Sequence, residues 1–280
     1  MKVLFVGNTT KDTNASIGKE IINTLLELEF EVYVDDEAYH IEATKFLSDD
    51  CLKDIEGAIL LGGDGTILEF ARTYKDIPVL AINLGRVGAL AVAELSNYKN
   101  YLVRLKKGCY RICDRLALDG KLSMASGKIV KFTAYNDIFL HRGNSIRMLP
   151  IEVALNDANK EILYADGVIL STPTGSTAYN LSAGGPFILP QARCYVLTPI
   201  CPQFKAITPI VIDEDYSITI SIVDGSEDAL LSIDGCKSIM FKSGDIIEIC
   251  KSDKSLRLIK FDDKQVLFGA LHKVATAINK

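Results

Sequence analysis

The first hundred residues alternate short apolar segments with amphipathic ones, and this alternation constrains the fold more than any other feature. Four apolar segments have the length of buried strands: Val3–Val6, Glu31–Val34, Ala58–Leu61 and Val79–Ile82. Between the first two, apolar side chains recur at near-helical spacing, and Ser16 is placed to cap that helix. Strands that alternate with helices are typical of a doubly wound, Rossmann-like parallel sheet. We therefore expect an α/β N-terminal domain over 1–100, with a ligand site at the carboxyl ends of its strands.

After residue 100 the pattern changes to short strand-like segments with few helices. The clearest of these segments are Lys128–Leu140, Ile151–Leu155, Tyr216–Val223, Ala229–Ile233 and Ile246–Cys250. Asp-Gly pairs at 119–120, 224–225 and 234–235 fall between such segments, as hairpin turns do. The pattern predicts a mainly β C-terminal domain over 101–265. We expect the last segment, about 266–280, to form a helix that returns to the first domain.

Charge and cysteine usage exclude several classes of function. The chain has 36 acidic and 31 basic residues, a net charge of −5, which disfavours nucleic-acid binding through bulk positive charge. The longest uncharged stretch, 167–192, is rich in Gly, Pro, Ser and Thr, so we expect no membrane partner. Seven cysteines show neither a C-x-x-C pair nor zinc-ligand spacing. The sequence thus predicts free thiols, a cytoplasmic location and no dedicated metal site.

A first glycine-rich segment, Gly62-Gly63-Asp64-Gly65-Thr66, lies where a buried strand gives way to a helix. Its glycines allow backbone amides to approach a ligand, and the following helix directs its positive end there. The segment is not a Walker loop, because no Gly-Lys-Ser/Thr follows. A carboxylate among phosphate-binding amides suits either proton acceptance from a hydroxyl or help in holding Mg²⁺. The alternative is a tight turn that needs glycine for geometry alone.

A second segment, from Ala165 to Pro186, runs from a strand into a loop of hydroxyl side chains, glycine and proline. Such a loop offers many hydrogen-bond donors without charge, which suits a nucleoside or sugar phosphate. Tyr179 is a candidate for stacking on a base, and Asp166 for accepting hydrogen bonds from a ribose or an amide. The alternative is an edge-strand loop with ordinary turn chemistry.

Together these segments resemble the two signature motifs of the NAD kinase family, the ATP–NAD 2′-phosphotransferases. The first matches the family's GGDGT, and the second its glycine- and threonine-rich motif, through Asp166-Gly167 and Thr172–Tyr179. Asn83–Gly88 and Pro199–Pro202 resemble two further family segments. The chain departs from the family pattern at three positions that bear on substrate preference: Ala89, Asp137 and Gln203.

The resemblance implies transfer of the γ-phosphoryl group of ATP, or of polyphosphate, to the 2′-hydroxyl of the adenosine ribose of NAD. Asp64 would orient or deprotonate that hydroxyl, and Mg²⁺ or another divalent cation would arrive with the ATP. The residues implied to hold the ATP phosphates are Gly62, Gly63, Gly65 and Thr66. Those implied to bind NAD are Asp64, Gly65, Asn136, Asp137, Asp166, Thr177, Ala178, Tyr179 and Ser182. Family members are usually homodimers or homotetramers.

Two other functions stay open beside this one. A GGDGT-type kinase acting on a lipid or another alcohol would share the first segment but should lack the second. A non-catalytic NAD- or NADP-binding sensor would keep the pocket, although the intact Asp64 and Gly65 favour an enzyme. Asp234-Gly235 fits a plain hairpin turn as well as a substrate contact, and His141-Arg142 fits a surface pair as well as a phosphate contact.

Overall fold

The computed structural model describes residues 1–261 with a few interruptions: Arg86, Val87, Ala89, Asp157, Asn159, Lys205, Ala206, Asp224, Ser226 and Glu227. The predicted C-terminal helix, the Ala89 departure and part of the 224–225 turn therefore lie outside the described residues. The chain divides into two units. Unit 1 contains Met1–Asp114 and the described residues from Leu256 onward, and unit 2 contains Arg115–Ser255. An α/β unit with a parallel sheet and a mainly β unit confirm the predicted fold class.

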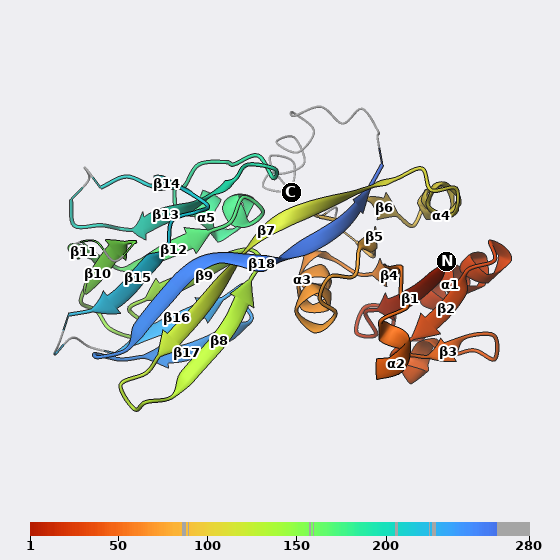
Figure 1. The fold of residues 1–280 in the computed structure, drawn as a ribbon, viewed down its shortest axis with the longest axis horizontal. Helices are drawn as coiled ribbons and strands as arrows, with labels where there is room; N and C mark the ends of the chain where they lie inside the picture. Colours follow the sequence, from red (N-terminus) through yellow and green to blue (C-terminus); the bar gives the residue numbers. More distant parts are fainter. Residues whose placement is uncertain are drawn as a thin grey trace. The chain divides into compact units, whose positions relative to one another are not determined.

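Unit 1 alternates strands and helices along the chain (Figure 1). Its elements are β1 (Lys2–Gly7), α1 (Ser16–Glu27), β2 (Glu31–Val34), η1 (Glu37–Tyr39), β3 (Lys45–Phe46), α2 (Asp49–Leu52), β4 (Gly57–Leu61), α3 (Asp64–Thr73), β5 (Val79–Asn83), β6 (Ala93–Glu94) and α4 (Tyr98–Lys106).

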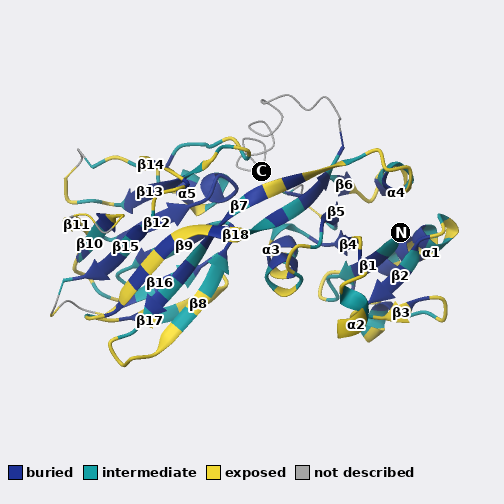
Figure 2. Cartoon of the chain, in the orientation of Figure 1, coloured by how far each residue is buried: buried dark blue, intermediate teal, exposed yellow. Residues whose placement is uncertain are grey.

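The strands of unit 1 form a parallel sheet in the order β3-β2-β1-β4-β5. The direction of winding reverses between β1 and β4, where Gly7 is paired with Leu61 at the carboxyl ends of both strands. All five residues of β4 are buried, as Figure 2 shows. An open α/β sheet binds its ligand where the strand order reverses, so this edge positions a site.

Helix α1 is capped differently from the prediction. Ser16 is the first residue of the helix and is not its cap, because the carboxylate of Asp12 occupies that role. It accepts hydrogen bonds from the amides of Gly18 at 2.8 Å and Ile17 at 3.3 Å. The chain reaches this arrangement through Ala15, which has a left-handed φ of 53°. The helix is thus capped by Asp12, which lies four residues before Ser16, the residue that the sequence suggested.

Unit 2 consists almost entirely of strands. They are β7 (Arg111–Ser123), β8 (Ile129–Ala134), β9 (Asp137–His141), β10 (Leu149–Leu155), β11 (Glu161–Ala165), β12 (Gly167–Ser171), β13 (Cys194–Ile200), β14 (Ile210–Asp213), β15 (Ile218–Ile222), β16 (Ala229–Ile233), β17 (Lys237–Phe241) and β18 (Ile246–Lys260). Two strands extend past the unit: β7 begins, and β18 ends, in unit 1. Two short turns of helix, η2 (Gly175–Thr177) and α5 (Tyr179–Ser182), follow β12.

These strands make two sheets around one apolar core. One sheet is antiparallel in the order β14-β13-β12-β9-β16-β17, and the other joins β11, β10, β15 and β18 to β7 and β8. Leu140 and Val168 from the first sheet share the core with Ile151 and Ile220 from the second. Because side chains alternate along a strand, Phe139 and its alternate neighbours lie on the opposite face of β9. That face is free to carry a site.

Two predicted turns have different outcomes. Asp119 and Gly120 lie inside β7, so the hairpin predicted there is wrong. Gly120 pairs across the sheet with Phe132, and a Cβ added to it would lie 2.3 Å from that ring, so the glycine accommodates an aromatic partner. The turn at Asp234-Gly235 is confirmed between β16 and β17, with φ of 49° and 65° as a type I′ turn requires. None of the helices within the described residues is long and apolar enough to cross a membrane.

Candidate active site

The first glycine-rich segment forms the turn between β4 and α3. Gly62 donates its amide to the carbonyl of Ile82 at 3.0 Å, and a Cβ added to it would lie 2.6 Å from the hydroxyl of Thr66. A glycine is therefore required at position 62 so that Thr66 can pack against it, which agrees with the alternative of a turn that needs glycine for geometry. Gly65 differs, because an added Cβ would meet no atom within 4 Å. Its surroundings are open although it lies in the first turn of α3, where backbone amides attract anions.

Asp64, the first residue of α3, is fixed on the side facing the chain after β5. Its carboxylate accepts a hydrogen bond from the amide of Leu90 at 3.2 Å. A Cβ on Gly88 would lie 2.1 Å from the Asp64 carboxylate, so the chain can pass this closely only with glycine there. In the same family-like segment, the side chain of Asn83 donates to the carbonyl of Gly85 at 3.2 Å. The segment thus orients the predicted catalytic carboxylate.

A neighbouring residue was missed by sequence reasoning. Asn8 directly follows β1, and its amide donates to the carbonyl of Leu61 at 3.0 Å. Its side-chain amide donates to the hydroxyl of Thr66 at 3.1 Å. A lone asparagine is no motif, but its place after the first strand, next to the point where the strand order reverses, is the signal that identifies it.

In unit 2 the predicted ribose-binding residues Asn136 and Asp137 lie at the break between β8 and β9. The carboxylate of Asp234 accepts the backbone amides of Asn136 at 2.7 Å, Asp137 at 3.1 Å and Tyr135 at 3.1 Å. These amides cannot join a regular ladder at the same time, which explains why the predicted continuous strand over 128–140 is interrupted. Asp234 is therefore more than a turn residue, because its carboxylate holds the backbone of a candidate site.

The second glycine-rich segment holds the same backbone from its other side. The amide of Thr172 donates to the carbonyl of Asn136 at 2.9 Å. Its hydroxyl donates to the backbone carbonyl of Tyr135 at 2.7 Å. Gly175 approaches so closely that an added Cβ would lie 2.1 Å from the Asn136 carbonyl oxygen. The conformation of residues 135–137 is thus fixed by two segments distant in the sequence.

Asp137 is electrostatically unusual. It is only 7% exposed, and burial raises the pKa of its carboxyl from 3.8 to about 6, with the charge of Asp234 as the second cause. With this pKa the Asp137 carboxyl is mostly ionised above neutral pH and mostly protonated at pH 5.

The remaining predicted dinucleotide residues follow β12. Tyr179 is 45% exposed, and its ring meets Phe139 edge to face at a centroid distance of 5.1 Å. Phe139 in turn stacks on His141 at 4.6 Å, and burial lowers the pKa of that imidazole. An exposed ring supported by other aromatic rings suits stacking on a base. Asp166 forms an ion pair with Arg142, whose Nε lies 3.0 Å from its carboxylate, so Arg142 is more than a generic surface residue.

A buried asparagine anchors the loop that carries Thr177, Ala178 and Ser182. Asn180 accepts the hydroxyl of Thr198 at 2.6 Å and donates to the carbonyls of Ser176 at 3.3 Å and Pro186 at 3.2 Å. Sequence reasoning passed over Asn180 because it assigned the residues of this loop from the family resemblance and had no sign of the buried contact with Thr198. The loop is therefore a built structure on the outer face of β13 and not an ordinary edge turn.

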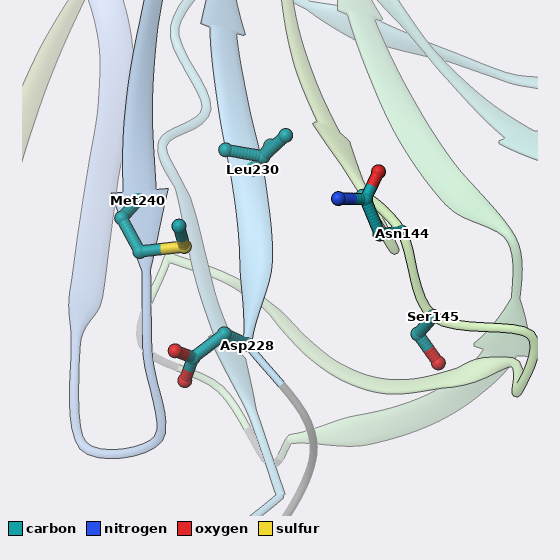
Figure 3. Close-up of a pocket in the computed structure, with 6 residues that line it drawn as sticks. Asn144, Ser145, Asp228, Leu230 and Met240 are labelled. Atoms are coloured by element: carbon teal, nitrogen blue, oxygen red, sulfur yellow. The ribbon is translucent and has the colours of Figure 1, made fainter.

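The structure brings the predicted residues together in two groups, one in each unit. Gly62–Thr66 gather in unit 1, whereas Asn136, Asp137 and the 172–182 loop gather in unit 2. A separate surface pocket of about 390 Å³ in unit 2 is lined by none of these residues; its lining is Gly143, Asn144, Ser145, Asp228, Leu230 and Met240 (Figure 3). Within the described part of the chain, no three His, Cys, Asp or Glu side chains gather so that they could hold a metal ion.

Comparison with known proteins addresses both groups. Residues 3–110 match the ATP-NAD kinase N-terminal domain, and residues 135–261 match the ATP-NAD kinase C-terminal domain. The NAD kinase of Caldanaerobacter subterraneus is 35% identical over 92% of this chain and 93% of its own. That of Clostridium kluyveri is 39% identical over 91% of this chain and 89% of its own.

Solved structures share the fold. An NAD kinase from Archaeoglobus fulgidus in complex with ATP aligns with a TM-score of 0.76 and 25% identity, over 99% of both chains. Yeast NADH kinase complexed with NADH aligns with a TM-score of 0.84 over 99% of this chain and 87% of its own, at 23% identity. The matched domains contain the glycine turn of unit 1 and the looped sheet of unit 2 in the same order, and the chain therefore belongs to the NAD kinase family.

Proposed function

We propose that this chain transfers the γ-phosphoryl group of ATP to the 2′-hydroxyl of the adenosine ribose of NAD, giving NADP and ADP. The observation that carries the proposal is the placement of Asp64. Its carboxylate is held by the Leu90 amide at 3.2 Å, beside a glycine turn that stays open at Gly65. Curated NAD kinases that are 35% and 39% identical over nine-tenths of the chain support the same reaction.

In the proposed step the ribose 2′-oxygen attacks the γ-phosphorus, and the bond from that phosphorus to the β,γ-bridging oxygen breaks. ADP leaves with the bond electrons, and the hydroxyl proton passes to the Asp64 carboxylate and then to solvent. We assign the phosphates to the backbone amides of Gly63 and Gly65 and to the positive end of α3, whereas Gly62, whose amide is donated to the carbonyl of Ile82, shapes the turn. Thr66 accepts a hydrogen bond from Asn8 and still has its hydroxyl proton for a phosphate oxygen.

A divalent cation, Mg²⁺ in our proposal, fits this donor set only as part of the nucleotide. The described residues present no cluster of acidic or imidazole side chains that would hold it alone. Mg²⁺ binds through one or two carboxylates plus substrate phosphates in many phosphoryl-transfer enzymes. When bound with ATP it would neutralise charge on the phosphates, and Asp64 keeps the role of orienting and deprotonating the acceptor hydroxyl.

For the acceptor, we assign Asn136 and Asp137 to the ribose hydroxyls and Asp166 to the nicotinamide end. The loop residues assigned to the dinucleotide are Thr177, Ala178, Tyr179 and Ser182. The family resemblance also assigns Asp64 and Gly65 to it. The fixed backbone of residues 135–137 and the supported ring of Tyr179 favour this assignment. An ionised Asp137 is the form that accepts hydroxyl protons.

We further propose a homodimer or homotetramer in the cytoplasm. Seven free thiols suit a reducing compartment. The oligomeric state follows from family resemblance alone and is measured directly by light scattering after gel filtration.

The test is incubation with NAD, ATP and Mg²⁺, with NADP read out by an NADP-specific dehydrogenase. The proposal predicts NADP formation that requires both substrates. NAD binding without NADP would indicate the sensor instead. Phosphate transfer to another alcohol but not to NAD would indicate a different GGDGT kinase.

A further inference from the structure

The chain after β1 forms a second wall beside the glycine turn. Gly7, the last residue of β1, is paired with Leu61, the last residue of β4. Asn8 then fastens the following loop to the turn, by its amide to the Leu61 carbonyl at 3.0 Å and its side chain to Thr66 at 3.1 Å. The loop after β1 therefore lies directly against the glycine turn.

Lys11 is held in place by the same asparagine. Its amide donates to the Asn8 carbonyl at 3.1 Å and to the Asn8 side-chain oxygen at 3.2 Å. The next residue, Asp12, is buried and caps α1 through Gly18 at 2.8 Å. The Lys11 backbone is thus fixed on both sides, and its side chain extends toward the glycine turn. Its ammonium nitrogen lies 3.7 Å from the point that a Cβ on Gly63 would occupy.

This ammonium has no anionic partner within the residues that the structure describes, and the side chain is exposed. By contrast Lys260, which also reaches this end of the unit, donates to the carbonyl of Leu90 at 2.8 Å. A cation close to the amino end of a helix is electrostatically unfavourable, because both carry positive charge. The arrangement becomes favourable once an anion with several charges binds between Lys11 and the amides of α3.

We propose that Lys11 binds the terminal phosphates of the phosphoryl donor, beside Gly63. This inference rests on the proposed function, which puts the donor phosphates at residues 62–66. A lysine ammonium acts on phosphate as a compact point charge, and it is most valuable where charge spreads over the γ-phosphoryl oxygens. Lys11 would then neutralise charge on the donor, a role separate from the one that we propose for Asp64 at the acceptor hydroxyl.

The test compares Lys11→Met and Lys11→Arg with a matched control, Lys75→Met. Lys75 is also an exposed lysine of unit 1, but it precedes β5 and thus lies at the amino ends of the strands. Calorimetry measures the Kd of inorganic tripolyphosphate, of ATP and of NAD for each protein, and circular dichroism confirms folding.

For Lys11→Met we expect the Kd of tripolyphosphate and ATP to rise about 10- to 100-fold, as for one lost charge-assisted hydrogen bond. The NAD Kd of Lys11→Met should stay within about twofold of the wild-type value. Lys11→Arg should retain most of the tripolyphosphate affinity, because it keeps the charge. Lys75→Met should bind all three ligands as the wild type does. The smallest effect that we expect on the tripolyphosphate Kd of Lys11→Met is about tenfold. A Kd within about threefold of the wild-type value would therefore overturn the inference. An equal loss of NAD and ATP affinity would overturn it too, because Lys11 would then serve the dinucleotide.

Binding of tripolyphosphate requires no turnover, so the two proposals fail separately. If the wild type binds tripolyphosphate through Lys11 but forms no NADP, the phosphate role holds and the proposed function fails. If the wild type forms NADP and Lys11→Met binds ATP normally, the proposed function holds and the Lys11 role fails.

Discussion

Replacing Asp234 by Asn tests how the candidate acceptor site is built. The Asp234 carboxylate accepts three backbone amides, with the shortest bond of 2.7 Å going to Asn136. An asparagine keeps one acceptor oxygen but loses the charge, so the bonds weaken. Hydrogen bonds to a charged group contribute about 1.5–3 kcal/mol each, and they share one oxygen here, so we expect a total loss of about 2–3 kcal/mol in the free energy of unfolding.

The same substitution also has a stabilising effect, because it removes the negative charge that disfavours ionised Asp137. Burial and, after it, the charge of Asp234 raise the Asp137 pKa from 3.8 to about 6. The folded protein therefore binds this proton more tightly than the unfolded chain does. The resulting stabilisation of about 3 kcal/mol is complete below pH ~4 and is lost as pH rises through ~6. Since burial is the larger cause, the Asp234 charge accounts for less than half of it, under about 1.5 kcal/mol.

Together these effects predict that Asp234→Asn destabilises the protein more at pH 5 than at pH 8. At pH 8 Asp137 is ionised, so removing the Asp234 charge relieves a repulsion and offsets part of the loss in the free energy of unfolding. At pH 5 Asp137 is mostly protonated, so this offset is smaller. The assay is urea unfolding followed by circular dichroism at both pH values. The control is the same substitution in an Asp137→Asn background, where its effect should not depend on pH. A larger loss at pH 8 than at pH 5 would refute the electrostatic coupling.

Further substitutions separate packing from ligand contact. Gly65→Ala should leave stability unchanged or raise it by up to about 1 kcal/mol, because nothing opposes the methyl group, yet lower kcat/KM for ATP about 10- to 100-fold by misplacing the phosphates. Stability is measured by urea titration, and an unchanged kcat/KM would remove Gly65 from the donor site. Gly175→Ala should lower the unfolding free energy by about 1–3 kcal/mol, because its methyl group would strike the Asn136 carbonyl; an equally stable variant would show that the approach is not required. Tyr179→Ala should weaken NAD binding about 5- to 100-fold in calorimetry, the range for a lost base–aromatic stack, and unchanged affinity would place the ring outside the site.

The sequence predicted the α/β unit well because local patterns determined it. The four predicted strands correspond closely to β1, β2, β4 and β5, since buried parallel strands appear as short apolar runs, whereas the short exposed strand β3 was not predicted. The glycine turn after β4 was found for the same reason, as three glycines beside a carboxylate form a local signature. Where a local pattern suffices, sequence reasoning locates the site.

Long-range contacts explain what the sequence could not show. The break at Tyr135 depends on Asp234, a residue roughly a hundred positions away, and the glycine at 120 serves Phe132 on the neighbouring strand and not a turn. Lys11 carries no motif at all; its position follows from Asn8 and from the pairing of β1 with β4. Such residues become visible only after the chain has folded.

The most direct test of the central claim is the turnover of Asp64→Asn in the NADP assay, with NAD affinity measured on the same protein. A carboxylate that orients and deprotonates the acceptor hydroxyl contributes about 100- to 10,000-fold to the rate. We predict a loss of kcat in that range, with NAD affinity within about threefold of wild type, because the amide side chain keeps the shape of the acid and still accepts the hydrogen bond from the Leu90 amide. Turnover within about tenfold of wild type would contradict the assignment of Asp64 as the catalytic residue.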